Sequence, residues 1–161
     1  MKKHIAFIGV KKQQKQIAGV LAQQLGMMVF DCEDYICFNN SMTIKQIVKK
    51  ANVTYFKKQV SKSIRELEDL QNMVFVSCNE YLLSLNDLQN LGQYCYVVYL
   101  FDSADLSKDG KNLPVTDENF LQLCISANKR YRSRCDFALD MHNLDENQTV
   151  NKICEFLQTL V

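Results

Sequence analysis

The sequence predicts an α/β domain in which a mostly parallel sheet is covered by helices on both faces. Short apolar runs rich in β-branched and aromatic residues alternate with segments whose apolar residues recur at helical spacing. This alternation is typical of parallel sheets, because each return to the same edge of the sheet requires a long crossover, usually a helix. With 161 residues, one proline and no evident linker or repeat, the chain is expected to form a single domain.

The first half of the chain is expected to supply three strands and three helices. Short apolar runs that end at polar residues predict buried strands at residues 5–10, 27–30 and 74–76. Apolar residues that recur every three or four positions predict helices at residues 17–25, 44–48 and 56–67. Gly26 follows the first of these helices, at a position where helices commonly end.

The second half is expected to add two strands and three helices around a polar segment. The same patterns predict strands at residues 94–101 and 137–139, and helices at residues 82–91, 120–131 and 150–160. We expect the first of these helices to end at Gly92. Residues 103–118 are polar and contain Gly110 and Pro114, which predicts a loop with at most one helical turn.

Composition and charge favour an ordinary globular protein. The chain is 47% hydrophobic with a net charge of +1, so we expect no nucleic-acid partner and no membrane partner. No apolar run approaches the roughly 20 residues that a transmembrane helix requires, and we expect no signal peptide. The seven cysteines show neither a Cys-x-x-Cys pair nor zinc-like spacing. We therefore expect reduced thiols and a cytoplasmic location.

The residues after the first strand resemble part of a phosphate-binding loop. Ligands of parallel α/β sheets bind beyond the carboxyl ends of the strands. In the pattern G-x-x-x-x-G-K-[ST], Gly9 and Lys15 match, whereas Gln14 replaces the second glycine and Gln16 the magnesium-binding hydroxyl residue. The segment is either an ordinary turn between strand and helix or a residual phosphate loop. In the second case its residues would be Gly9, Lys11, Lys12 and Lys15.

Two acidic residues, Asp31 and Glu33, follow the second predicted strand. They either cap the next helix or bind a ligand at the edge of the sheet. The acidic pattern of residues 30–36, followed by Ser-Met-Thr-Ile-Lys-Gln-Ile at residues 41–47, resembles the shikimate kinase family. Further matches follow in the family's order at Tyr55-Phe56-Lys57, Tyr96-Val97-Val98-Tyr99-Leu100, Leu113-Pro114-Val115 and residues 131–136. The resemblance covers essentially the whole chain.

The resemblance implies a fold and a set of site residues. The implied fold is a three-layer α/β/α P-loop kinase-like domain with a five-stranded parallel sheet over residues 1–161. Residues 33–62 would form substrate-binding-like helices, and residues 103–119 would form a shortened lid-like loop. The implied substrate-pocket residues are Asp31, Glu33, Lys57, Asn79 and Glu80. Lys111 would be the basic residue of the lid, and Asp31 would hold Mg²⁺ through water.

The chain departs from the family where the shikimate carboxylate is bound. An arginine, a triple-glycine turn and a second arginine bind it in the family, and their places hold Lys57, Cys78-Asn79-Glu80 and Ala127. Lysine cannot form the bidentate pair that arginine forms with a carboxylate, and Glu80 brings negative charge to the site. Lys129 and Arg130 follow Ala127 but are expected on other faces of the helix.

Transfer of a phosphoryl group is also compromised in this sequence. The lid arginine of the family corresponds to Leu113, and loss of such an arginine alone can cost about 10³–10⁵ in rate. No residue is therefore assigned a catalytic role, and the isolated His4 and His142 are given none. The basic residues Lys129, Arg130, Arg132 and Arg134 form either a partner-facing patch or a solvated helix end.

Three functional hypotheses follow from the sequence. The first is a catalytically impaired or inactive kinase relative that binds a protein partner or a small metabolite and needs no cofactor. The second is a divergent shikimate kinase, or another small-molecule kinase, that uses ATP and Mg²⁺ to phosphorylate a hydroxyl group. The third is a regulator that binds a metabolite without turnover, which requires Asp31, Glu33 and Lys57 to converge on one pocket.

Overall fold

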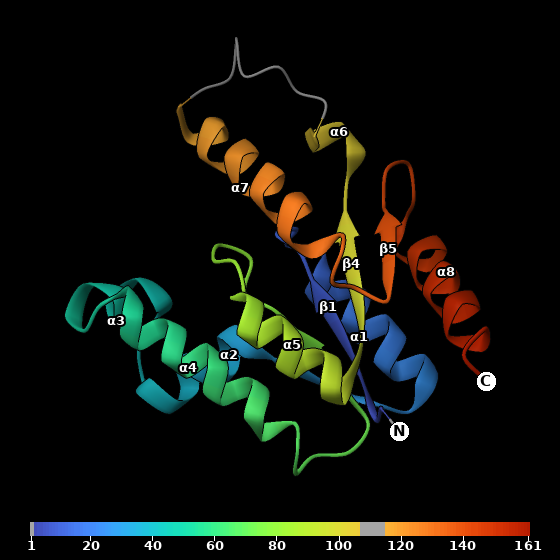
Figure 1. The fold of residues 1–161 in the computed structure, drawn as a ribbon, viewed down its shortest axis with the longest axis horizontal. Coiled ribbons are helices and arrows are strands. Elements are labelled where there is room, and N and C mark those ends of the chain that lie inside the picture. Colours follow the sequence, from blue (N-terminus) through green and yellow to red (C-terminus); the bar gives the residue numbers. More distant parts are fainter. Residues whose placement is uncertain (1, 107–114) are drawn as a thin grey trace.

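The computed structural model describes residues 2–106 and 115–161, which form an α/β domain around a five-stranded parallel sheet. The strands are β1 (His4–Ile8), β2 (Met28–Asp31), β3 (Met73–Val76), β4 (Cys95–Phe101) and β5 (Phe137–Asp140). Their order in the sheet is β2-β3-β1-β4-β5, and every pairing is parallel. Figure 1 shows helices on both faces of this sheet, which confirms the predicted fold class.

The central strands are apolar throughout because both of their faces are covered. Every residue of β1 and of β3 is buried. Ala6 and Ile8 of β1 join one hydrophobic core, and Ile5 and Phe7 join the other, since successive side chains of a strand point to opposite faces.

The helices divide between these two cores. Helices α1 (Gln14–Leu25) and α8 (Glu146–Gln158) pack together on one face of the sheet. The core on the other face is formed by residues of α2 (Cys32–Asn40), α3 (Ile44–Lys50), α4 (Val53–Glu66), α5 (Leu85–Tyr94) and the second half of α7 (Val115–Tyr131). The short helix α6 (Ser103–Leu106) follows β4. In Figure 1, α3 and α4 extend sideways from the sheet as a separate lobe. No helix in the described part of the chain has the length and apolar character needed to cross a membrane.

Some boundaries predicted from the sequence are wrong. Helix α5 continues through Gly92 to Tyr94, because Leu91 is completely buried and β4 follows directly at Cys95. Helix α7 begins at Val115, five residues before the predicted start, whereas α6 is the single helical turn that was predicted within the 103–118 segment. Residues 107–114, which include the predicted lid residue Lys111, lie outside the described residues. All seven cysteines are free thiols.

Candidate ligand site at the carboxyl edge of the sheet

The turn after β1 depends on a glycine because it runs very close to β4. Gly9 has a φ of +146°, a conformation that residues with a Cβ rarely adopt. A Cβ added to Gly9 would lie 2.4 Å from the carbonyl oxygen of Leu100. Contact between two strands therefore accounts for this glycine without any need for a bound phosphate.

The side chain of Gln14 fills the space inside this turn. Gln14 is the first residue of α1 and is 0% exposed. Its Nε2 lies 3.7 Å from the Cβ position built on Gly9 and donates a hydrogen bond to Asn79 Oδ1 at 3.1 Å. Its backbone N–H donates to the carbonyl oxygen of Lys11 at 3.2 Å. The buried Oε1 of Gln14 has no hydrogen-bond partner among the described atoms. The space between Gly9 and the start of α1 therefore holds a glutamine side chain.

Two of the lysines around the turn pair with carboxylates. Lys11 Nζ lies 2.7 Å from Asp105 Oδ2, and both side chains are largely buried. Lys15 bonds to Asp34, and its Nζ lies 3.8 Å from Asp31 Oδ2. The hydrogen bond to Asp34 raises the pKa of the Lys15 ammonium, so this lysine stays charged. Lys12, the remaining basic residue predicted for the loop, is exposed.

Asp31 caps a helix, as one of the two sequence interpretations proposed. Its Oδ1 accepts a hydrogen bond at 2.9 Å from the backbone N–H of Asp34, in the first turn of α2. Burial raises the pKa of Asp31, and burial together with the charges of Asp31 and Glu80 raises the pKa of Glu33. Within the described residues, no group of three or more acidic, histidine or cysteine side chains is arranged to hold a metal ion.

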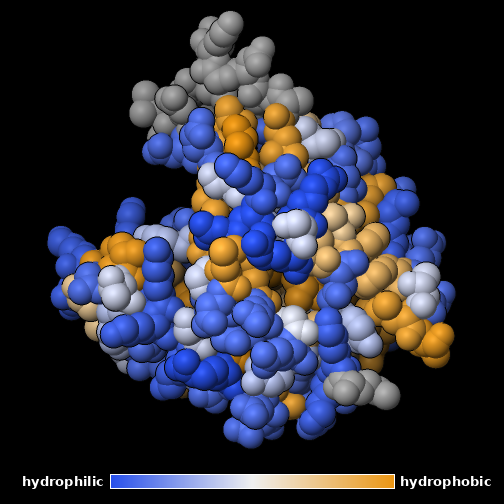
Figure 2. Space-filling model, in the orientation of Figure 1, coloured by the Kyte–Doolittle hydropathy of each residue, from blue (hydrophilic) through white to orange (hydrophobic). Residues whose placement is uncertain are grey.

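A cavity of about 310 Å³ lies between α4, the 77–84 loop after β3, the start of α5 and the end of α7. Its charged and polar lining consists of Lys57, Ser61, Ser84, Asp87 and Arg130, and its walls are mainly aromatic and aliphatic. Figure 2 shows the molecular surface indented between the lobe of α3 and α4 and the part that carries α7.

Only one of the predicted substrate-pocket residues lines this cavity. Lys57 contributes to its wall, whereas Asp31, Glu33, Asn79 and Glu80 do not. Asn79 instead bonds to Gln14, and the charges of Glu80 and Asp31 act on Glu33. The convergence of Asp31, Glu33 and Lys57 that the regulator hypothesis requires is therefore not found here.

Arg130 reaches the cavity, so its predicted placement on an unrelated face of the helix is wrong. Ala127 is completely buried, and Arg130 lies three residues later, which places both on one side of α7. Arg130 Nη1 donates to the carbonyl oxygen of Leu83 at 2.9 Å. The neighbouring Tyr131 accepts a hydrogen bond from the Leu83 backbone N–H at 2.8 Å. The last turn of α7 therefore fixes the loop that borders the cavity.

Asp87 is a site residue that the sequence analysis missed. It is only 4% exposed, and its Oδ1 accepts a hydrogen bond from Ser61 Oγ at 2.7 Å. Its backbone N–H donates to Ser84 Oγ, which caps α5. The spacing of Ser84 and Asp87 indicates the start of a helix. Nothing local in the sequence shows that α4 and α7 bring Ser61 and Arg130 to the same place.

Comparison with known proteins assigns the chain to a family and supports the fold described above. The sequence model of one protein family, described as Shikimate kinase, matches residues 15–158. The chain belongs to the shikimate kinase family. No curated protein matches the sequence closely enough to count as a relative.

Solved shikimate kinases share the fold over nearly their whole length. The enzyme from Aquifex aeolicus is 20% identical with a TM-score of 0.82, and the alignment covers 98% of this chain and 97% of that one. Shikimate kinase from Acinetobacter baumannii in complex with shikimate is 16% identical with a TM-score of 0.85, covering 99% and 95%. Deoxyadenosine kinase from M. mycoides is 18% identical with a TM-score of 0.61, covering 97% and 99%. These likenesses establish a P-loop kinase fold.

Members of the shikimate kinase family use ATP and Mg²⁺, but the residues after β1 do not fit these groups. A phosphate must approach backbone N–H groups inside the turn, where the Gln14 side chain lies. Gln16 offers an amide where magnesium needs a hydroxyl. Lys15 is directed to Asp34 and Asp31 at the start of α2.

Proposed function

We propose that this member of the shikimate kinase family does not transfer phosphate efficiently and serves as a binding module. The observation that carries the proposal is the buried Gln14 side chain, which bonds to Asn79 across the turn where ATP phosphates would bind. A phosphoryl-transfer site works almost entirely by positioning and by charge stabilisation. A turn without room for phosphate can supply neither.

The charges around the turn support the same conclusion. Lys11 is paired with Asp105, and Lys15 is paired with Asp34 and Asp31. To contact a phosphate, each lysine would first have to leave a carboxylate. An ATP-dependent kinase, the alternative function, would require these pairs to break and Gln14 to leave its buried position in the same step.

The cavity supports a binding role for the protein. Lys57 and Arg130 both line it, so two cations border a space of about 310 Å³ at the carboxyl edge of the sheet. Small-molecule sites start at about 300 Å³, so a small metabolite is the favoured ligand. A protein partner remains the second possibility for the same module. The seven free thiols are consistent with the cytoplasmic location that we propose.

Calorimetric titration with ATP and Mg²⁺ tests the proposal. We expect no heat of binding from the unmodified protein and no phosphate transfer to shikimate. Binding at micromolar affinity together with turnover would contradict the proposal.

Restoring the family's turn provides the matched experiment. The triple variant Gln14→Gly, Gln16→Thr, Asn79→Gly removes the side chain from the turn and supplies the missing hydroxyl. We expect its ATP affinity to rise about tenfold or more, whereas the exposed neighbour change Gln13→Gly should have no effect. A triple variant that folds normally but gains no affinity would show that Gln14 is not the obstacle.

A further inference from the structure

Two side chains of opposite charge face the cavity without pairing with each other. Asp87 and Arg130 both line it, one from the first turn of α5 and the other from the last turn of α7. Among the side chains that the structure describes, no cationic nitrogen lies within 4.0 Å of the Asp87 carboxylate. Among these same described side chains, no carboxylate oxygen lies within 4.0 Å of the Arg130 guanidinium.

Both groups keep unused hydrogen-bonding capacity. The Asp87 side chain accepts one hydrogen bond from Ser61, although it is 96% buried (4% exposed). A guanidinium carries five N–H donors, and one of those of Arg130 is used by Leu83. A buried charge is costly unless the group is hydrogen-bonded and also paired with a charge of opposite sign. The empty space between the two groups is therefore where a compensating ligand would be stabilised most.

The rest of the cavity lining favours a ligand with a small apolar side chain. The ring of Phe56 packs on Tyr81 with centroids 4.8 Å apart. The other apolar side chains of the wall are those of Val60, Cys78, Leu82, Leu83 and Leu85. Lys57 adds a second cation, so the site carries two positive charges and one negative charge.

We propose that the cavity binds a small zwitterion with an apolar side chain, of the class of the free amino acids. Its ammonium group would bond to Asp87 and Ser61, and its carboxylate would bond to Arg130 and Lys57. This inference rests on the proposed function, since it names the ligand of a module that does not transfer phosphate.

Other small acids complement the site less well. A simple carboxylic acid would satisfy Arg130 but would bring a second negative charge near Asp87, which would stay unpaired. A hydroxy acid could donate a hydrogen bond to Asp87 but would not neutralise its charge. Among these ligands, only the zwitterion offers a partner of opposite charge to both groups.

Ligand-observed NMR tests the proposal on the full chain. The probes are the L-amino acids, β-alanine and 4-aminobutyrate, each at about 10 mM, followed by calorimetry of any that bind. Each binder is compared with the hydroxy acid and the unsubstituted carboxylic acid of the same carbon skeleton. We expect at least one apolar amino acid to bind about tenfold or more tightly than both analogues. Absence of binding by every amino acid, or equal affinity for the unsubstituted acid, would overturn the proposal.

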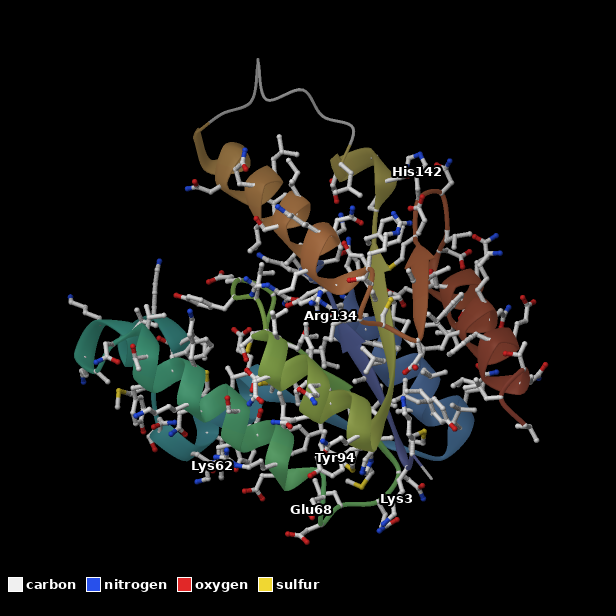
Figure 3. The ribbon with its side chains drawn as sticks, viewed as in Figure 1. Lys3, Lys62, Glu68, Tyr94, Arg134 and His142 are labelled. Atoms are coloured by element: carbon white, nitrogen blue, oxygen red, sulfur yellow. The ribbon has the colours of Figure 1, made fainter. Side chains whose placement is uncertain are left out.

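Substitutions locate the two charges. Asp87→Asn should abolish the preference for the amino group while leaving weak binding of the carboxylic acid, and Arg130→Gln should weaken both ligands. Lys57→Gln, which removes the second cation proposed to bind the carboxylate, should also weaken both ligands. Lys62→Gln is its charge-matched control, because Lys62 is exposed on α4 and does not line the cavity (Figure 3). A thermal unfolding curve checks that each variant folds. An Asp87→Asn protein that is folded and still prefers the amino acid would overturn the assignment.

The two proposals fail separately. Amino-acid binding is measured without nucleotide, and nucleotide binding is measured without amino acid. ATP binding and turnover would contradict the loss of phosphoryl transfer but not the ligand class. If no amino acid binds and ATP gives no heat of binding, the ligand class is overturned and the non-catalytic assignment stands.

Discussion

At the scale of single residues, Gly9 and Gln14 control what the turn after β1 can hold. Gly9 brings the chain against the Leu100 carbonyl, and Gln14 occupies the space that this approach leaves. Gly9 matches the phosphate-loop pattern, yet its close approach to β4 also gives it a structural role. A glycine that matches the phosphate-loop pattern is therefore not by itself a sign of a nucleotide site.

A glycine comparison tests this structural role. Gly9→Ala should lower the free energy of unfolding by about 1–3 kcal/mol or more, because the new Cβ meets the Leu100 oxygen and the φ of +146° is strained. Gly19→Ala, within α1 and with nothing within 4 Å, should raise it by about 1 kcal/mol. Urea unfolding followed by circular dichroism measures both. Equal effects of the two changes would contradict the role given to Gly9.

At the scale of elements, His4 ties β1 to the connection between α4 and β3. The ring is 2% exposed, its Nδ1 accepts from the Met73 backbone N–H at 3.1 Å, and its Nε2 lies 2.9 Å from the Leu67 oxygen. These partners require a neutral ring with its proton on Nε2. Burial lowers the pKa of His4 below 6.5 because it disfavours the charged ring. Protonation of Nδ1 would also remove the acceptor that the Met73 N–H uses.

This arrangement makes stability depend on pH with a defined sign. Below pH 6.5 the unfolded chain binds a proton at His4 that the folded chain does not, so stability falls as the pH decreases from that value. We expect the urea midpoint to drop between pH 7.5 and 5.5. His4→Gln, which keeps a donor and an acceptor, should show a smaller drop over the same range. A variant with the same pH dependence as the parent would exclude His4 as the source.

At the scale of the whole molecule, the sheet positions the cavity but long-range contacts decide its chemistry. The alternation of apolar runs predicted all five strands, since buried parallel strands are apolar throughout. Helix α2 was not predicted from periodicity, because only Cys32 and Ile36 of its nine residues are buried. Asp87 and Arg130 come from helices that are distant in sequence, so no local pattern could place them together.

The contact between α7 and the 77–84 loop is the whole-molecule feature most open to test. Tyr131→Phe leaves the buried Leu83 N–H without its acceptor, which should cost about 1–3 kcal/mol in the free energy of unfolding. Hydrogen exchange of the Leu83 amide should also become faster. Tyr94→Phe, at the end of α5, is the control and should change neither quantity. An unchanged exchange rate at Leu83 in the Tyr131 variant would contradict the proposed link.

The hydrogen bond between Gln14 and Asn79 has a consequence for how this lineage could change. Replacing Gln14 alone by glycine would reopen the turn but would strand the Asn79 side chain without its partner. Replacing Asn79 alone would leave the turn blocked and a second buried atom of Gln14 unsatisfied. Each single replacement therefore costs the hydrogen bond between these two side chains. A change that opens this turn therefore requires Gln14 and Asn79 to be replaced together, so the two positions are coupled.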